Sequence, residues 1–532
     1  MWKPASEGAS PAAQETPRSY SHGEVLKVLA GLVTGMITAM ITTYIVGTAL
    51  PTIVGELGGQ DQYSWVASAT LLTMAASMPL WGKVSDLYGR KRVYQSALVI
   101  FVAASMAAGF APDIGWLIAA RAVQGVGVGG LQSLSQIILG DLVEPRERGR
   151  YSGYMGSAFA ISTLTGPLIG GFLVDAEGLG WRWCFFVSLP LAIVAFIIVS
   201  RLLKLPKLPT GNVPVDWWGA ILITGGATTI MLLLTLGGKE FPWNSHWTYA
   251  LGICSTLFFL LAIPVERAAA APILPPRLFR NRNYVLICAV SILVGACLFG
   301  TTIYLPQYLQ IVKGMTPTAS GIMTLPMVGG TFVAALVSGQ FVARLGRWKV
   351  FPATGMALVT IGLLLLSRLH GDSSRWAIGG SIAIVGAGLG LTMQILILAA
   401  QNAVERRDIA SSTSSATFFR TFGGAVGVAA FGSILSTRVA DEMREQMARF
   451  RLHLPTGNGI PALGSPEAIG RLPGLVQAII REAFSNALHS VFLAAVLVAA
   501  LGFLGTLFMH EVPLRTSPSA GETKKDHEPM EG

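Results

Sequence analysis

Apolar runs close to 20 residues long recur along the whole chain, and this recurrence constrains the fold more than any other feature. Such a run crosses the roughly 30 Å hydrocarbon core of a bilayer as a helix that rises about 1.5 Å per residue. In lipid, backbone polar groups must be paired within their own segment, so these runs are predicted to be helices. Only 12% of the 532 residues are charged, about half the share typical of a soluble domain. The sequence therefore predicts an all-α polytopic membrane protein.

Fourteen spans are predicted. They cover residues 26–50, 64–82, 93–110, 114–140, 151–174, 184–201, 217–236, 247–265, 284–304, 318–342, 350–367, 377–399, 416–437 and 489–509. The distribution of Lys and Arg tests this number, because positive side chains favour cytoplasmic loops. With the N-terminus in the cytoplasm, the cytoplasmic segments carry 25 of these residues and the six short external loops carry 5. Both termini are therefore predicted to be cytoplasmic.

Two loop sequences recur in the same order in the two parts of the chain. GKVSDLYGRKR (Gly82–Arg92) is echoed by GQFVARLGRWK (Gly339–Lys349), and DLVEPRERGR (Asp141–Arg150) is echoed by NAVERRDIAS (Asn402–Ser411). Parallel structural repeats are a transporter architecture. The repeat predicts two related six-helix bundles with an inserted pair of helices between them.

This organisation divides the chain into seven parts. They are a disordered cytoplasmic tail (1–24), an N-terminal six-helix bundle (25–205), the inserted helices (206–270), helices of the C-terminal bundle (271–437), a long external segment (438–488), the last span (489–510) and a cytoplasmic tail (511–532). In the external segment, VADEMREQMARFRLHL looks amphipathic. This segment is interpreted either as a helical hairpin that touches an envelope partner or as a passive connector.

The motifs resemble those of the major facilitator superfamily, in its 14-helix drug/proton antiporter branch typified by EmrB and QacA. GKVSDLYGRKR matches the superfamily's loop signature, and RAVQGVGVGG (Arg121–Gly130) and GPLIGG (Gly166–Gly171) match the signatures of its fourth and fifth helices. The resemblance covers about residues 25–437 and the last span. It implies two bundles that rock about a central cavity.

The resemblance implies a conformational gate at the cytoplasmic side, in which Asp86 faces the start of the span at 416–437, near Ser411. A carboxylate is stabilised beside a positive helix N-terminus. The predicted gate and coupling residues are Gly82, Asp86, Gly89, Arg90, Arg92, Arg121, Asp141 and Glu144.

Arg121 and Arg420 are the two basic residues inside predicted spans, whereas no Asp, Glu or His lies mid-span and Asp216 sits at a cytoplasmic end. Arginine in a membrane normally faces a polar partner or cavity. The branch usually places an Asp where this chain has Thr42. We therefore expect hydroxyls and amides, including Thr42, to satisfy Arg121, which would also bind an anionic or carbonyl-bearing substrate. Proton coupling would then run through Asp86, Asp141 or Glu144, and an uncoupled facilitator is the competing interpretation.

In this fold the first and fourth helices of each half line the cavity. The resulting candidates for the substrate cavity are Thr42, Tyr44, Thr48, Gln124, Gln132, Phe299, Tyr304, Gln307, Met393 and Gln394. Small residues allow helices to approach closely, and Pro weakens a helix. The candidate packing residues are Gly125, Gly166, Pro167, Gly170 and Gly171.

The predicted function is export of hydrophobic or amphipathic small molecules by alternating access, with protons as the coupling ion; lipid or glycolipid transport is the alternative. No nucleotide or catalytic motif supports an enzyme. The four cysteines form no CxxC or Cys/His cluster, so no metal site or cofactor is expected. Basic stretches lack interleaved aromatics, which disfavours nucleic acid as a partner. Arg outnumbers Lys by 27 to 11, which weakly indicates a bacterial inner membrane.

Overall fold

The computed structural model describes residues 22–57, 63–143, 145–176, 179–203, 216–237, 241–269, 272–315, 317–370, 373–405, 408–450 and 474–514. Within these ranges the chain is helical apart from short connections and one isolated bridge between Gly237 and Phe241. Twelve helical stretches are long and apolar enough to cross a membrane. Two further helices, α2 and α8, have 26 and 20 residues, which is also enough to cross. The predicted all-α membrane fold is confirmed.

The N-terminal half contains six crossing elements, the last of which is a short helix continued by a longer one. Its helices are α1 (His22–Leu57), α2 (Tyr63–Tyr88), α3 (Arg90–Gly109), α4 (Ile114–Leu142), α5 (Pro145–Asp175), α6 (Trp183–Phe186) and α7 (Ser188–Leu202). Leu32, Tyr94 and Phe101 are fully buried in the core that these helices share.

The C-terminal half repeats this plan with longer final helices. Its elements are η2 (Leu278–Arg280), α10 (Arg282–Gln307), the π-helical turn η3 (Tyr308–Val312), α11 (Pro317–Met323), α12 (Leu325–Leu345), α13 (Val350–Ser367), α14 (Arg375–Asn402), α15 (Ile409–Phe450) and α17 (Gly474–Leu507). A separate core, which includes Tyr284, Trp348 and Leu363, holds them together. Large apolar side chains such as Trp218, Phe172 and Leu497 remain exposed, as expected of a surface that faces lipid.

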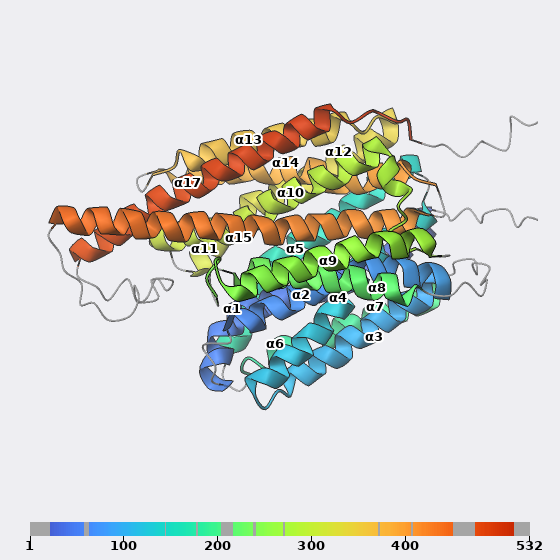
Figure 1. The fold of residues 1–532 in the computed structure, drawn as a ribbon, viewed down its shortest axis with the longest axis horizontal. Coiled ribbons are helices and arrows are strands. Elements are labelled where there is room, and N and C mark those ends of the chain that lie inside the picture. The colour runs from blue at the N-terminus through green and yellow to red at the C-terminus, as the bar shows by residue number, and fades with distance from the viewer. Residues whose placement is uncertain are drawn as a thin grey trace, which may run out of the picture.

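The inserted helices α8 (Trp217–Leu236) and α9 (His246–Ala268) lie between the two halves (Figure 1). Met231 of α8 packs with Leu72 and Ala75 of α2, and Phe422 of α15 borders the same cluster. The inserted pair therefore covers the line along which α2 of one half meets α15 of the other.

Helices α15 and α17 extend well beyond the other helices at one end of the bundle (Figure 1). With 42 residues, α15 is about 63 Å long, roughly twice the hydrocarbon thickness of a bilayer. In the projecting part, the Asn486 amide donates to the Glu442 carboxylate over 3.1 Å, and Met443 and Ile480 are buried. Residues 438–450 and 474–488 thus form two helical arms, while 451–473 lie outside the described residues.

Close helix approach explains the glycine-rich stretches of α4 and α5. A Cβ atom at Gly125 would clash with the Thr70 backbone of α2, and one at Gly170 would lie 2.8 Å from the Ile45 carbonyl oxygen of α1. A Cβ at Gly166 would meet the side chain of Tyr44. These glycines allow backbone contact between neighbouring helices. The surroundings of Pro167 and Gly171 lie outside the described set.

Candidate functional site

Arg90 organises the cytoplasmic end of the N-terminal half. Its guanidinium lies 2.6 Å from the Asp86 carboxylate and 2.7 Å from the Asp141 carboxylate, and it also donates to the Ser85 hydroxyl over 2.6 Å. Arg90 is only 7% exposed, so this Arg90 cluster (Ser85, Asp86, Arg90 and Asp141) is largely shielded from water. Because a guanidinium can serve several acceptors in one plane, one side chain joins the ends of α2 and α4 to the start of α3.

The other residues of the predicted gate have distinct positions. Gly89 has φ +88° between α2 and α3, a conformation that side chains other than hydrogen disfavour. A Cβ at Gly82 would lie 3.0 Å from the Ala410 carbonyl oxygen and 3.0 Å from the Ser414 Cβ, so Gly82 makes the contact with the start of α15. Asp86 forms its ion pair with Arg90 of the same cluster. Arg92 is exposed, and Glu144 lies outside the described residues.

Polar side chains join the two halves near their cytoplasmic ends. The Gln401 amide of α14 donates to the Gln136 carbonyl oxygen over 3.3 Å and accepts from the Arg148 guanidinium over 3.3 Å. The Gln136 side chain also donates to Gln394 over 3.3 Å. We call these four residues the cytoplasmic seam. Since all four are buried, the two halves are closed against each other at this level.

Arg121 is buried at 2% exposure, seven residues into α4 and about 10 Å along its axis from the external end. Its Nε donates to the Val66 carbonyl oxygen over 2.9 Å, and its buried Nη1 has no hydrogen-bond partner. The expectation that Thr42 satisfies Arg121 is wrong. The Thr42 hydroxyl instead donates to Thr38 of its own helix over 2.8 Å, as hydroxyls in helices commonly do.

The four glutamines among the cavity candidates have different surroundings. Gln124 donates to the Ser105 hydroxyl of α3 over 2.8 Å, so this amide binds within the N-terminal half. Gln132 is 7% exposed and its Oε1 has no partner, whereas Gln394 belongs to the cytoplasmic seam. Gln307 is half-buried at the end of α10.

Two of the remaining cavity candidates, Tyr304 and Phe299, contact the neighbouring helix α15. Tyr304 donates to the Val428 carbonyl oxygen over 2.6 Å, and Phe299 lies against Gly424 of α15. Met393 is buried at 6% exposure, while Tyr44 is half-buried. The side chain of Thr48 lies outside the described set.

Sequence reasoning missed two features of this region, the Gln401–Arg148 contact and the buried Glu266. Gln401 and Arg148 adjoin the repeated loops that follow α4 and α14, but neither was selected as a gate residue. Arg420, by contrast, is one of the two arginines expected inside spans, and it is buried at 8% exposure. Glu266 of α9 is 4% exposed, and its Oε1 has no hydrogen-bond partner.

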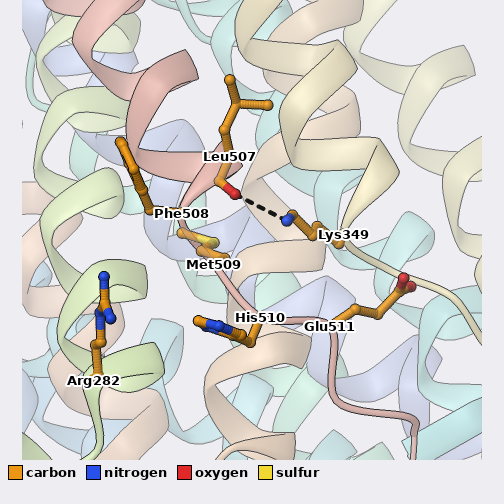
Figure 2. A pocket seen from close by; sticks show the side chains of 7 residues that line it. All are labelled: Arg282, Lys349, Leu507, Phe508, Met509, His510 and Glu511. Atoms are coloured by element: carbon orange, nitrogen blue, oxygen red, sulfur yellow. Dashed lines mark hydrogen bonds between the residues drawn. The ribbon is translucent and has the colours of Figure 1, made fainter.

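The loop of the C-terminal half that repeats Gly82–Arg92 has different contacts. Instead of an ion-pair cluster, it contacts the segment that follows α17. The backbone N–H of Trp348 donates to the Glu511 carboxylate over 3.1 Å, and its indole donates to the Val512 carbonyl oxygen over 2.9 Å. Lys349, whose ammonium donates to the Leu507 carbonyl oxygen over 2.9 Å, lines one pocket together with His510 and Arg282, which lies on its opposite side (Figure 2). The repeated loops therefore have similar sequences but different partners.

A separate ion pair ties the linker before α10 to the start of α15. The Arg277 guanidinium makes two hydrogen bonds with Asp408, at 2.7 and 3.1 Å. The hydrogen bond with Asp408 raises the pKa of Arg277, so this arginine stays charged at any physiological pH.

Comparison with known proteins identifies the family. The chain matches the Major Facilitator Superfamily over residues 32–428. It belongs to that superfamily. The chain is 31% identical to the multidrug transporter protein MdtP of Bacillus subtilis (strain 168) over 520 residues, covering 94% of this chain and 95% of that protein. It is also 36% identical to the MFS-type transporter Rv1877 of Mycobacterium tuberculosis (strain ATCC 25618 / H37Rv) over 471 residues, 88% of this chain and 67% of the relative.

Solved structures of the superfamily share the fold. The human organic anion transporter MFSD10 aligns with a TM-score of 0.60 at 12% identity, covering 91% of this chain and 99% of that one. The proton:xylose symporter XylE aligns with a TM-score of 0.59 at 12% identity, covering 92% and 97%. The family match and the bacterial multidrug-transporter relatives identify this chain as a multi-pass transporter of the inner membrane and not an enzyme, and they confirm the predicted family resemblance.

Proposed function

We propose that this protein exports hydrophobic or amphipathic small molecules, such as drugs or toxic metabolites, by alternating access. Relatives that align over most of this chain support the proposal by their names. Besides MdtP, they include Multidrug resistance protein 3 of Bacillus subtilis (strain 168), at 30% identity, and the efflux pump dotC of Dothistroma septosporum, at 33% identity.

One observation on this chain's own residues supports substrate binding inside the membrane. Arg121 keeps an unpaired N–H at 2% exposure in a membrane-crossing helix. A buried guanidinium without a partner is costly, and an anionic or carbonyl oxygen of a substrate would satisfy it. We therefore infer that Arg121 binds the polar group of an otherwise apolar substrate.

We propose that the cytoplasmic seam and the Arg90 cluster form the gate that opens and closes during transport. In the structure the seam closes the two halves at their cytoplasmic ends. Export requires this end to open so that a substrate can enter from the cytoplasm or the inner leaflet. Asp86 and Asp141 pair with Arg90 at the same cytoplasmic end, and we propose that proton coupling acts through Asp86, Asp141 or Glu144.

Two alternatives make different predictions. The first alternative is a facilitator that is not coupled to protons, because this chain has Thr42 where the 14-helix drug/proton antiporter branch usually has an Asp. A lipid or glycolipid could also be the cargo, and the projecting arms of α15 and α17 would then guide it or contact an envelope partner.

Dye efflux from proteoliposomes tests the proposal. We expect the purified full-length protein to move rhodamine 6G and 8-anilinonaphthalene-1-sulfonate, with rates that rise in an imposed pH gradient. Arg121→Gln should lower transport of the anionic sulfonate at least tenfold, whereas Arg375→Gln, at an exposed external position, should not. Dye movement that ignores the gradient would support the facilitator, and movement of a labelled phospholipid without either dye would support the lipid alternative.

A further inference from the structure

Two acidic side chains meet at the cytoplasmic end of the inserted helices. Asp216 precedes α8, and its Oδ1 accepts from the Gly219 backbone N–H over 2.8 Å. Glu266 lies near the end of α9, and its Oε2 accepts from the Leu274 backbone N–H over 2.9 Å. We call Asp216 and Glu266 the carboxyl pair.

The remaining oxygens of the two carboxyl groups lie next to the same glycine, Gly219. A Cβ atom at Gly219 would clash with Asp216 Oδ2 and Glu266 Oε1 at the same time. Because both oxygens contact one position, they lie within about 5 Å of each other, the range in which two carboxyl groups share a site. Gly219 thus leaves the space that lets the two groups approach.

These two oxygens are both sealed from water and both lack a hydrogen-bond donor. Two ionised carboxylates in contact would repel each other and leave both oxygens unpaired. One proton removes both the repulsion and the missing hydrogen bond, because it neutralises one carboxyl group and forms an O–H···O bond to the other. We propose that the carboxyl pair is a binding site for a single proton, which is held at neutral pH in the closed state of the cytoplasmic seam.

No basic side chain among the described residues pairs with either carboxyl group, and a proton fits the pair better than a metal ion does. Lys83, at the end of α2, attracts the Glu266 charge but forms no ion pair with a described residue. Arg267, the next residue on α9, is exposed, and Arg277 is paired with Asp408. A hard metal ion needs about six oxygen ligands, and no group of three potential metal-ligating side chains occurs among the residues that the structure describes.

The pair also lies at the connection between the halves. Leu274, which Glu266 holds, leads to Arg277 and so to the start of α15. Loss of the proton would create two like charges in contact and push the end of α9 away from α8. The proton therefore clamps this connection, and cytoplasmic alkalinisation is expected to loosen it.

Infrared difference spectroscopy on the full-length protein in lipid nanodiscs tests this proton site. On raising the pH from neutral, the wild type should lose the carbonyl band of one protonated carboxyl group. Asp216→Asn and Glu266→Gln should both lack that band, because the introduced amide donates the hydrogen bond and leaves the other group ionised. Asp113→Asn is the matched control, since Asp113 also caps a helix, through the Trp116 N–H at 2.8 Å, but is exposed; it should keep the band.

A band that persists in both variants, or is absent from the wild type, would overturn the proton site. Both variants should keep the helical circular dichroism spectrum of the wild type, which shows that they fold. The infrared test of the proton site measures no transport, so its result is independent of the proposed export function. A wild type that moves no dye would contradict export, while the infrared comparison would still decide the carboxyl pair.

Discussion

Replacing Gln401 with alanine is expected to open the cytoplasmic seam. The Gln401 amide donates to the Gln136 carbonyl oxygen and accepts from Arg148, both at 3.3 Å and both across the two halves. Its third bond, to the Thr413 hydroxyl at 3.0 Å, stays within the C-terminal half. Alanine removes both cross-half bonds while leaving the backbone of α14 helical.

The size of the effect follows from these contacts. A buried neutral hydrogen bond contributes about 0.5–1.5 kcal/mol and one to a charged group about 1.5–3 kcal/mol. The distances are long, and Arg148 keeps its bonds to Val143 and Gly140 in its own half, so about 1–3 kcal/mol is the expected loss. The closed state should therefore lose population relative to the open state by roughly 5- to 150-fold.

Spin labels can measure this shift. Arg92 and Arg347 are exposed cytoplasmic residues, one in each half, and cysteines there can be labelled once the four native cysteines are replaced. Double electron–electron resonance should show a longer distance in the Gln401→Ala variant. Gln95→Ala, which removes a 2.7 Å bond to Ser200 within one half, is the matched control. An unchanged distance in Gln401→Ala, or an equal increase in Gln95→Ala, would refute the role of the seam.

Three further outcomes are expected from thermal or chemical unfolding of the purified protein. Arg90→Ala should cost about 3–5 kcal/mol, because it leaves two shielded carboxylates without their partner, and Arg90→Lys should recover only part of this; equal stability of Arg90→Ala and wild type would contradict the cluster. Gly125→Leu should destabilise by about 1–3 kcal/mol or more through its clash with α2, whereas Gly329→Leu, with open space around its Cβ position, should not. Arg277→Ala and Asp408→Asn should each cost about 1 kcal/mol, and a double variant whose loss equals the sum of the two would show that the pair is uncoupled.

Much of the fold could be predicted from the sequence because membrane spans depend on local properties. Run length and the positions of Lys and Arg gave the number and direction of the helices, including the less apolar α2. The close contacts of Gly125 and Gly170 could be predicted for the same reason, since backbone approach between helices requires small residues wherever it occurs.

The site was less predictable because it depends on which side chains meet across helices. Thr42 had a suitable depth for Arg121, but its hydroxyl bonds its own helix instead. Gln401 and Arg148 act together although they lie 253 positions apart. The sequence places Asp216 at a cytoplasmic end, but only the structure shows that Asp216 and Glu266 lie together beside Gly219.

Cross-linking the cytoplasmic ends tests the central claim, that these ends must separate during transport. The Gly82 Cβ position lies 3.0 Å from the Ser414 Cβ, so a small adjustment reaches the roughly 3.5–4.5 Å that a disulfide needs. A Gly82→Cys/Ser414→Cys protein, with either single variant as control, should stop moving rhodamine 6G when oxidised and resume after reduction. Full transport by the oxidised, cross-linked protein would contradict the account.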